Sequence, residues 1–217
     1  MPSTPSARRP LKTRDAGWAR ALARRLAQRR VSPNDISLLS LLFAGLGGIA
    51  MLTVPAVGPA MQITLLVLAA GCIQLRLLCN LLDGMVAVEG GLGTRAGEVY
   101  NELPDRLADP LLIVPAGYAS GLAGGPELAW VAGCLALLTA YIRMLGGACG
   151  LPQNFQGPMA KPHRMATMTL GLLAAALLVP LNLEGAALIV TLLVVALGAT
   201  WTAVQRTRAI VVALESR

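Results

Sequence analysis

Acidic and amide side chains gather between residues 80 and 109, in the stretch NLLDGMVAVEGGLGTRAGEVYNELPDRLAD. Asn80 and Asp83 lie three residues apart, and Gly97, Asn101 and Asp105 follow one another at intervals of four. Residues three or four apart share one face of a helix, so two antiparallel helices joined by a short loop would bring these oxygens together. Converging oxygen ligands suit a hard divalent cation such as Mg²⁺ or Mn²⁺. The spacing therefore predicts a metal site with Asn80, Asp83, Asn101 and Asp105 as ligands.

One further acid and two glycines extend this predicted site. Glu98 lies three residues before Asn101 and seven before Asp105, so it shares their helical face and is a further candidate ligand. Gly84 and Gly97 have no side chain and would let a ligand or a neighbouring helix approach the backbone closely. Spacing alone predicts a site for a divalent metal and phosphate, without naming a reaction.

The elements that must position these residues are long and apolar. The chain has 217 residues, of which 55% are hydrophobic and 13% charged, whereas soluble domains carry about 25% charged residues. Its apolar runs of roughly twenty residues can cross a ~30 Å hydrocarbon layer as helices, and they do not alternate as barrel strands would. We therefore predict an all-α polytopic membrane protein with six transmembrane helices, at residues 36–55, 60–82, 99–121, 127–148, 165–182 and 185–204.

The N-terminal part of the chain differs in composition from the rest. Residues 1–15 are rich in proline, serine and arginine, which predicts a disordered basic tail. Residues 16–31 have helical spacing, with Trp18, Ala21, Leu22 and Leu26 on one side, which predicts an amphipathic helix on an anionic membrane surface. Nucleic-acid binding is disfavoured because this basic stretch directly precedes a membrane span. Residues 32–205 form the predicted six-helix transmembrane catalytic domain, and residues 206–217 a cytoplasmic tail.

Lysine and arginine are distributed unevenly between the two ends of the predicted helices. If the chain has six spans, all lysine and arginine residues fall at or near the side of the membrane that holds the N-terminus. The opposite connections, near 55–60, 121–127 and 181–186, contain none. The positive-inside rule assigns the basic side to the cytoplasm. Both termini and the acidic site are therefore predicted to be cytoplasmic, in a bacterial-type inner membrane.

The stretch DGMVAVEGGLGTRAGEVYNELPD resembles the signature of the CDP-alcohol phosphotransferase family, also called CDP-alcohol phosphatidyltransferases. In that signature, Asp-x-x-Asp-Gly-x-x-Ala-Arg is followed by Gly-x-x-x-Asp-x-x-x-Asp. The residues that match at the family's spacing are Asp83, Gly84, Ala87, Gly97 and Asp105. SPNDIS, residues 32–37, is similar to the Pro-Asn motif that precedes the family's first span. The resemblance covers most of the chain and implies six spans with cytoplasmic termini.

The resemblance also implies an activity and a set of roles. It implies transfer of a phospho-alcohol group, phosphatidyl in the case of CDP-diacylglycerol, from a CDP-linked lipid donor to an acceptor hydroxyl with release of CMP. It implies two bound metal ions, with Asp105 acting as the general base. It assigns nucleotide binding to Asn34, Asp83, Gly84, Ala87 and Gly97. It assigns binding of the acceptor or its phosphate to Arg143, Lys161 and Arg164. A homodimer is a further expectation, and the acceptor alcohol stays unknown.

Three positions depart from the family's pattern, since Asn80 and Asn101 replace Asp, and Val88 replaces Arg. An amide keeps an oxygen ligand but has no charge, so two dications should be held less well. One hypothesis is that Glu98 or Glu102 supplies the missing charge, or that a second metal arrives with the substrate diphosphate. The alternatives are a catalytically altered or inactive homologue and a small transporter. A transporter would place polar residues near the bilayer midplane of several helices. In this chain, the polar residues instead concentrate at one face of the membrane.

Overall fold

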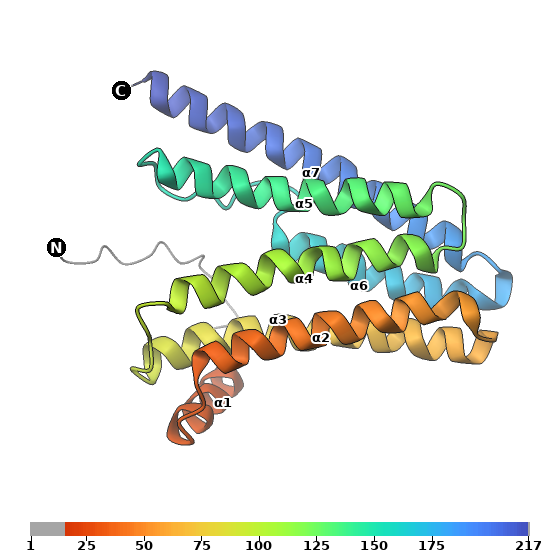
Figure 1. Ribbon diagram of the computed structural model, residues 1–217, viewed down its shortest axis with the longest axis horizontal. Helices are drawn as coiled ribbons and strands as arrows, with labels where there is room; N and C mark the ends of the chain where they lie inside the picture. Colours follow the sequence, from red (N-terminus) through yellow and green to blue (C-terminus); the bar gives the residue numbers. More distant parts are fainter. Residues whose placement is uncertain (1–15, 217) are drawn as a thin grey trace.

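Every element of the computed structural model within residues 16–216, the part of the chain that the structure describes, is helical. Six long helices form one bundle (Figure 1): α2 (Pro33–Thr53), α3 (Pro59–Glu89), α4 (Gly97–Ala119), α5 (Gly125–Ala148), α6 (Lys161–Leu178) and α7 (Glu184–Glu215). Short 3₁₀ turns, η2 (Val54–Ala56) and η3 (Val179–Leu181), follow α2 and α6. The all-α prediction is confirmed. The predicted disordered tail lies outside the described residues.

Five of these helices, within the residues described, are long and apolar enough to cross a membrane: α2, α3, α5, α6 and α7. The exception, α4, contains three prolines and five charged residues, namely Glu98, Glu102, Asp105, Arg106 and Asp109. It nevertheless runs through the bundle with the others and packs mainly against α2 and α5. The predicted membrane architecture is therefore supported by five helices, and the count of six spans stays a prediction.

Proline and glycine mark the boundaries of several helices. Pro33 and Pro59 lie in the first turns of α2 and α3, where the missing N–H has no helical partner to lose and the fixed φ suits the helix. Gly91, just after α3, has a φ of 63°, and Gly124, just before α5, has a φ of 77°. These left-handed conformations are readily adopted only by glycine, so both turns depend on it.

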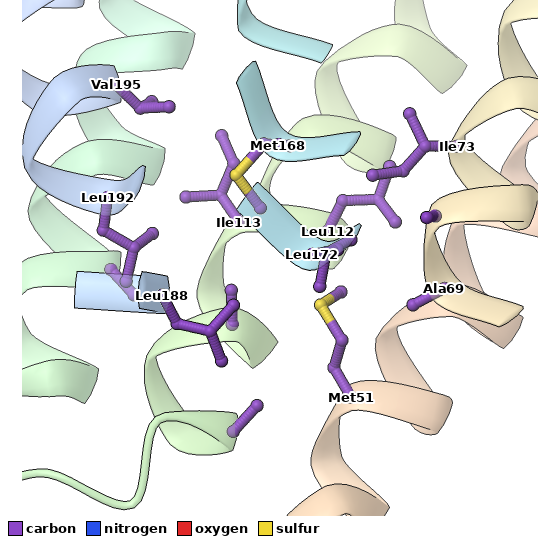
Figure 2. Close-up of a cluster of buried hydrophobic side chains, with 14 of the residues drawn as sticks. Met51, Ala69, Ile73, Leu112, Ile113, Met168, Leu172, Leu188, Leu192 and Val195 are labelled. Carbon is purple, nitrogen blue, oxygen red and sulfur yellow. The ribbon is translucent and has the colours of Figure 1, made fainter. Parts of the chain in front are cut away.

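An apolar core fills the interior of the bundle and contains buried residues of all six long helices, α2 to α7; part of it is shown in Figure 2. The buried side chains labelled there are Met51, Ala69, Ile73, Leu112, Ile113, Met168, Leu172, Leu188, Leu192 and Val195. At Gly48 of α2, a Cβ atom would collide with the carbonyl oxygen of Leu111 on α4. Small residues that allow such close backbone approach are typical of contacts between membrane helices.

The helix predicted for residues 16–31 is observed as α1 (Gly17–Gln28), which packs beside α3 (Figure 1). Its buried face centres on Ala19 and Ala23, and Leu22 is half-buried. Trp18 and Ala21, which were expected on the same side, are exposed. The two alanines allow the backbone of α1 to approach α3, and this contact sets which side of the helix is covered.

The two ends of the bundle differ in what they contain (Figure 1). Helix α1, the connection 90–96 and the C-terminus of α7 lie at one end, and the connections 120–124 and 182–183 lie at the other. Helix α7 continues to Glu215, so residues 206–215 are helical, and their assignment as a cytoplasmic tail stays a prediction. Helix α6, by contrast, begins inside the bundle. The segment 149–160 leaves the end of α5 and runs back along the bundle before α6 starts.

Candidate active site

Three carboxylates and three cations meet near the end of the bundle that holds α1 and the connection 90–96. They are Arg76 and Asp83 of α3, Asp105 and Asp109 of α4, and Lys161 and Arg164 of α6. Asp105 and Asp109 lie one turn apart, as do the two cations of α6, and the two helices run in the same direction (Figure 1). Each carboxylate of α4 therefore meets one cation of α6, while Arg76 reaches both carboxylates.

Asp105 lies in the more open part of this cluster. Its Oδ1 accepts hydrogen bonds from Asn80 Nδ2 at 2.8 Å and from Arg76 Nη2 at 3.3 Å. Its Oδ2 accepts a hydrogen bond from the ammonium of Lys161. The side chain of Asp105 retains 13% exposure and that of Lys161 retains 25%. Three donors thus fix the orientation of a carboxylate that a solute can still reach.

Asp109 lies one turn further along α4 and is sealed from solvent. Its Oδ1 accepts from Arg76 Nη2 at 2.9 Å, and its Oδ2 accepts from a guanidinium nitrogen of Arg164. The side chains of Asp109 and Arg164 are each 2% exposed. Arg164 Nη1 also donates to the carbonyl oxygen of Met159 at 3.2 Å. This closed ion-pair network joins α3, α4 and α6.

The apolar core begins directly beyond the sealed network. Each of the three helices continues, three or four positions from its network residue, with a core side chain: Ile73 on α3, Leu112 on α4 and Met168 on α6 (Figure 2). Apolar neighbours on this side keep water away from the ion pairs, so the charges must satisfy one another. The network around Asp109 is therefore the boundary between the polar site and the core.

Asp83 is the third carboxylate and has different partners. It is 4% exposed. Its Oδ2 accepts from Ser37 Oγ at 2.6 Å, and its Oδ1 accepts from the backbone N–H of Gly84 at 2.5 Å. Ser37 is the last residue of SPNDIS, so this motif of α2 directly contacts the acidic site. Among the ion pairs of the described residues, none includes Asp83.

A second group of ion pairs lies around Glu102 of α4. Glu102 Oε2 accepts from Arg143 Nη2 at 2.6 Å and from Arg106 Nη2 at 2.9 Å. Arg143 Nη1 donates to Gln153 Oε1 at 2.5 Å, and the guanidinium carbon lies 5.1 Å from the ring centroid of Phe155. Arg143 therefore ties the segment 149–160 to α4 and α5, in addition to any role it has toward a substrate.

The structure brings two of the predicted metal ligands into direct contact, and the ligand role of all five stays a prediction. Asn80 and Asp105 are hydrogen-bonded to each other, and Asp83 lies one turn from Asn80 on α3. Asn101 and Glu98 are exposed on α4. The spacing placed all five on two facing helices, but α4 packs mainly on α2 and α5 and has little contact with α3.

The residues assigned to the nucleotide lie around the connection between α3 and α4. Gly84 and Ala87 occupy the last turns of α3, and Gly97 begins α4. Asn34 Nδ2 donates to Thr94 Oγ1 at 3.5 Å, which brings the start of α2 beside this connection. These positions are close enough in the fold to form one binding region, and their roles stay predictions.

Two residues of the cluster were not singled out by the sequence pattern. Arg76 counted only toward topology, although it lies four residues before Asn80, and that spacing places both on one helical face. Ser37 belongs to the SPNDIS motif, but nothing local indicates its contact with Asp83, which is 46 residues away in the chain.

The two-metal site that the resemblance implies stays a prediction. Within residues 16–216, no three or more His, Cys, Asp or Glu side chains gather in a way that could hold a metal ion. Two of the four signature positions are amides, and one of these, Asn101, is exposed. Both oxygens of Asp105 already accept hydrogen bonds from Asn80, Arg76 and Lys161.

A bundle of apolar helices with a charged, partly open site near one end defines a membrane-embedded protein that handles a polar group at the membrane boundary. The family model described as CDP-alcohol phosphatidyltransferase matches residues 30–204. The chain therefore belongs to the CDP-alcohol phosphatidyltransferase family, which confirms the resemblance, and it is an integral-membrane, metal-dependent phosphotransferase. The family uses divalent metals such as Mg²⁺ or Mn²⁺.

Individual proteins are similar to this chain in sequence or in fold. Inner membrane protein YnbA of Escherichia coli (strain K12) is 27% identical over 197 residues, which cover 85% of this chain and 87% of YnbA. Phosphatidylinositol phosphate synthase (PgsA1) of Mycobacterium tuberculosis has the same fold. Its structure with CDP-DAG bound gives a TM-score of 0.73 at 22% identity, covering 90% of this chain and 94% of that chain. Its complex with manganese and citrate gives 0.72 at 21% identity, covering 88% of each.

Proposed function

We propose that this chain transfers the phosphatidyl group of CDP-diacylglycerol to the hydroxyl of an acceptor alcohol and releases CMP, as a step of phospholipid biosynthesis. Family membership supports the reaction, and the structural relative with CDP-DAG bound supports the donor. The observation that carries the proposal is Asp105, an oriented carboxylate that keeps 13% side-chain exposure within an otherwise closed cluster. A general base must be held in place and must also be reached by the hydroxyl it deprotonates.

In the proposed reaction, the acceptor oxygen forms a bond to the phosphorus of the phosphatidyl group. The bond from that phosphorus to the bridging oxygen of the diphosphate breaks, and CMP leaves with this oxygen. The acceptor's proton passes to Asp105. Asn80 and Arg76 hold one carboxylate oxygen and Lys161 contacts the other, so the base is oriented before the acceptor arrives. Such positioning lowers the barrier by removing the need to order the groups during reaction.

We place the nucleotide at the connection between α3 and α4. The short side chains of Gly84, Ala87 and Gly97 leave the backbone accessible there, and Asn34 already reaches this connection through Thr94. Asp83 lies between this region and the base. The donor's acyl chains would then lie in the membrane while its head group meets the charged end of the bundle.

Of the three cations assigned to the acceptor, Lys161 is the best placed. It contacts Asp105 and keeps 25% side-chain exposure. Arg164 is held by the sealed Asp109, and Arg143 is paired with Glu102. An anionic group on the acceptor would therefore meet Lys161 first.

We further propose that both termini and the active site face the cytoplasm of a bacterial-type inner membrane. The concentration of lysine and arginine at one end of the predicted spans supports this orientation. A homodimer is also proposed, from the family resemblance and from the small residues on the helix faces.

Asn80 and Asn101 favour a second candidate, a member of the family with altered or lost activity. Each replaces a carboxylate of the signature, and the loss of two charges weakens any metal site that depends on them. The lead proposal is preferred because the general-base position is retained as Asp105 and is held by three donors.

Release of CMP by the purified chain tests the proposed function. The chain in detergent is supplied with Mg²⁺ or Mn²⁺, CDP-diacylglycerol and a panel of acceptor alcohols. We expect CMP release that depends on one acceptor or a small set of them. Absence of CMP with every donor and acceptor pair would contradict the proposal and favour the altered homologue.

A further inference from the structure

We infer that this site holds a single divalent cation, bound at Asp83 and taken up together with the diphosphate of the nucleotide. The ammonium of Lys161 stands at Asp105, where a second cation would otherwise be needed. The inference specifies the metal content of the proposed active site, and it rests on the proposed nucleotide substrate.

Asp83 has no cation in direct contact among the described residues. It is 4% exposed, yet its two donors, the hydroxyl of Ser37 and the N–H of Gly84, are uncharged. No ion pair of the described residues reaches it. A buried carboxylate that no cation contacts directly is costly. Each of its oxygens accepts one hydrogen bond and has a second lone pair for a metal.

Asp105 does not need a metal ion to balance its charge. Lys161 and Arg76 bring two positive charges to its oxygens, and a dication added there would be repelled by both. Asn80 donates an amide hydrogen to Oδ1, which an aspartate at the same position could not do. The replacement of Asp by Asn at position 80 therefore suits a site in which Asp105 is held by hydrogen-bond donors instead of by a metal.

The number of available ligands explains why the cation should arrive with the nucleotide. No three acidic, histidine or cysteine side chains gather for a metal within residues 16–216. Mg²⁺ is commonly bound through one or two carboxylates together with the phosphates of a substrate. The diphosphate thus supplies the oxygens that the protein lacks, and Asp83 anchors the ion on the α3 side of the site.

Binding of Mn²⁺ to the full chain in detergent, followed by electron paramagnetic resonance with and without CDP, tests this inference. We expect one Mn²⁺ per chain with CDP and little binding without it. The Asp83→Asn variant should lose this ion, whereas Asp105→Asn should retain it. Two Mn²⁺ per unaltered chain, or loss in Asp105→Asn but not in Asp83→Asn, would overturn the inference.

The role of Lys161 is tested by removing its ammonium group and restoring a carboxylate at position 80, so that a second divalent cation can bind at Asp105. The double variant Asn80→Asp with Lys161→Met should bind a second Mn²⁺, and Lys161→Met alone should raise the content above one. A content that stays at one in both variants would contradict the assignment of Lys161. Thermal midpoints and size-exclusion profiles show that each variant is folded.

The outcome is separable from that of the proposed function. One Mn²⁺ per chain without CMP release in the same preparation would contradict the proposed function and support this inference. CMP release by a chain that binds two Mn²⁺ would support the proposed function and contradict this inference.

Discussion

Asp105 and Asp109 lie one turn apart on α4 and share the guanidinium of Arg76, yet their surroundings are opposite. The first is 13% exposed and binds a lysine that is itself 25% exposed. The second is 2% exposed and binds an arginine that is equally buried. Two identical side chains on one helix are thus placed in two regions, one open to a substrate and one closed by its neighbours.

The difference arises from where α6 begins. Its first residue, Lys161, meets Asp105 at the open edge, and Arg164 meets Asp109 further inside, next to the apolar core. A lysine is a flexible point charge that can move aside for a substrate, whereas an arginine is a rigid fork suited to a fixed, buried pair. The pairing of residue types therefore matches an active carboxylate at position 105 and a structural one at position 109.

Replacement of the open carboxylate should have the largest effect on activity. Asp105→Asn keeps the shape of the side chain but removes the base, so CMP release should fall by roughly 100-fold or more. Binding of CDP should remain, because the nucleotide contacts lie at the connection between α3 and α4. Turnover at the unaltered rate would remove Asp105 from the role of base.

Replacement of the sealed carboxylate should chiefly affect stability. Asp109→Asn leaves Arg164 buried without a counter-charge and leaves Arg76 with Asp105 as its one carboxylate partner, which should lower the free energy of unfolding by about 3–5 kcal/mol. Denaturant unfolding in detergent measures this change. Glu127→Gln, which alters an exposed carboxylate of α5, is the control and should be near neutral. Equal stability of the two variants would show that the Asp109 network is not structural.

A substitution at the apolar contact between α2 and α4 compares the charged site with a region that has no charges. Gly48→Ala should destabilise the chain by about 1–3 kcal/mol, because the new Cβ would collide with the Leu111 carbonyl oxygen. Gly45→Ala is the matched control on the same helix, since a Cβ there has open space. The pair is compared by thermal unfolding, and equal midpoints would contradict the close contact between α2 and α4.

A smaller effect is expected at the ion pairs beside the site. Glu102→Gln removes the charge that faces Arg143 and Arg106, and its side chain is only partly buried. We expect a loss of about 1 kcal/mol in stability. The segment 149–160 should become more accessible to hydrogen exchange, since Arg143 also holds Gln153. Unchanged exchange would mean that Arg143 holds this segment without help from Glu102.

The smallest effect is expected for Glu98, on the exposed side of the same helix. Because its charge is solvated, Glu98→Gln should shift the midpoint of the metal titration by less than about twofold. A larger shift would place Glu98 at the metal after all.

The sequence predicts those features that depend on local pattern. The apolar runs mark most ends of the long helices within a few residues, although α3 continues past the predicted end at residue 82 to Glu89. The spacing of Asp83, Gly84, Ala87, Gly97 and Asp105 identifies the family. Helix α7 continues past the predicted end of the last span at residue 204 to Glu215 and includes Arg206 and Arg208.

The partners of the acidic residues depend on packing between distant segments. Lys161 meets Asp105 across 56 residues of sequence, and Arg164 meets Asp109 across 55. Neither contact has a local period, and both require the starting point of α6 inside the bundle. The separation between an open and a sealed carboxylate could therefore be seen only in the structure.

The most direct test of the account compares CMP release from CDP-diacylglycerol by the unaltered chain, Asp105→Asn and Asp109→Asn, at a temperature where all three are folded. We predict that Asp105→Asn loses turnover while Asp109→Asn retains it in proportion to its folded fraction. Retention of turnover by Asp105→Asn, with loss in a folded Asp109→Asn, would contradict the assignment of the open carboxylate as the base.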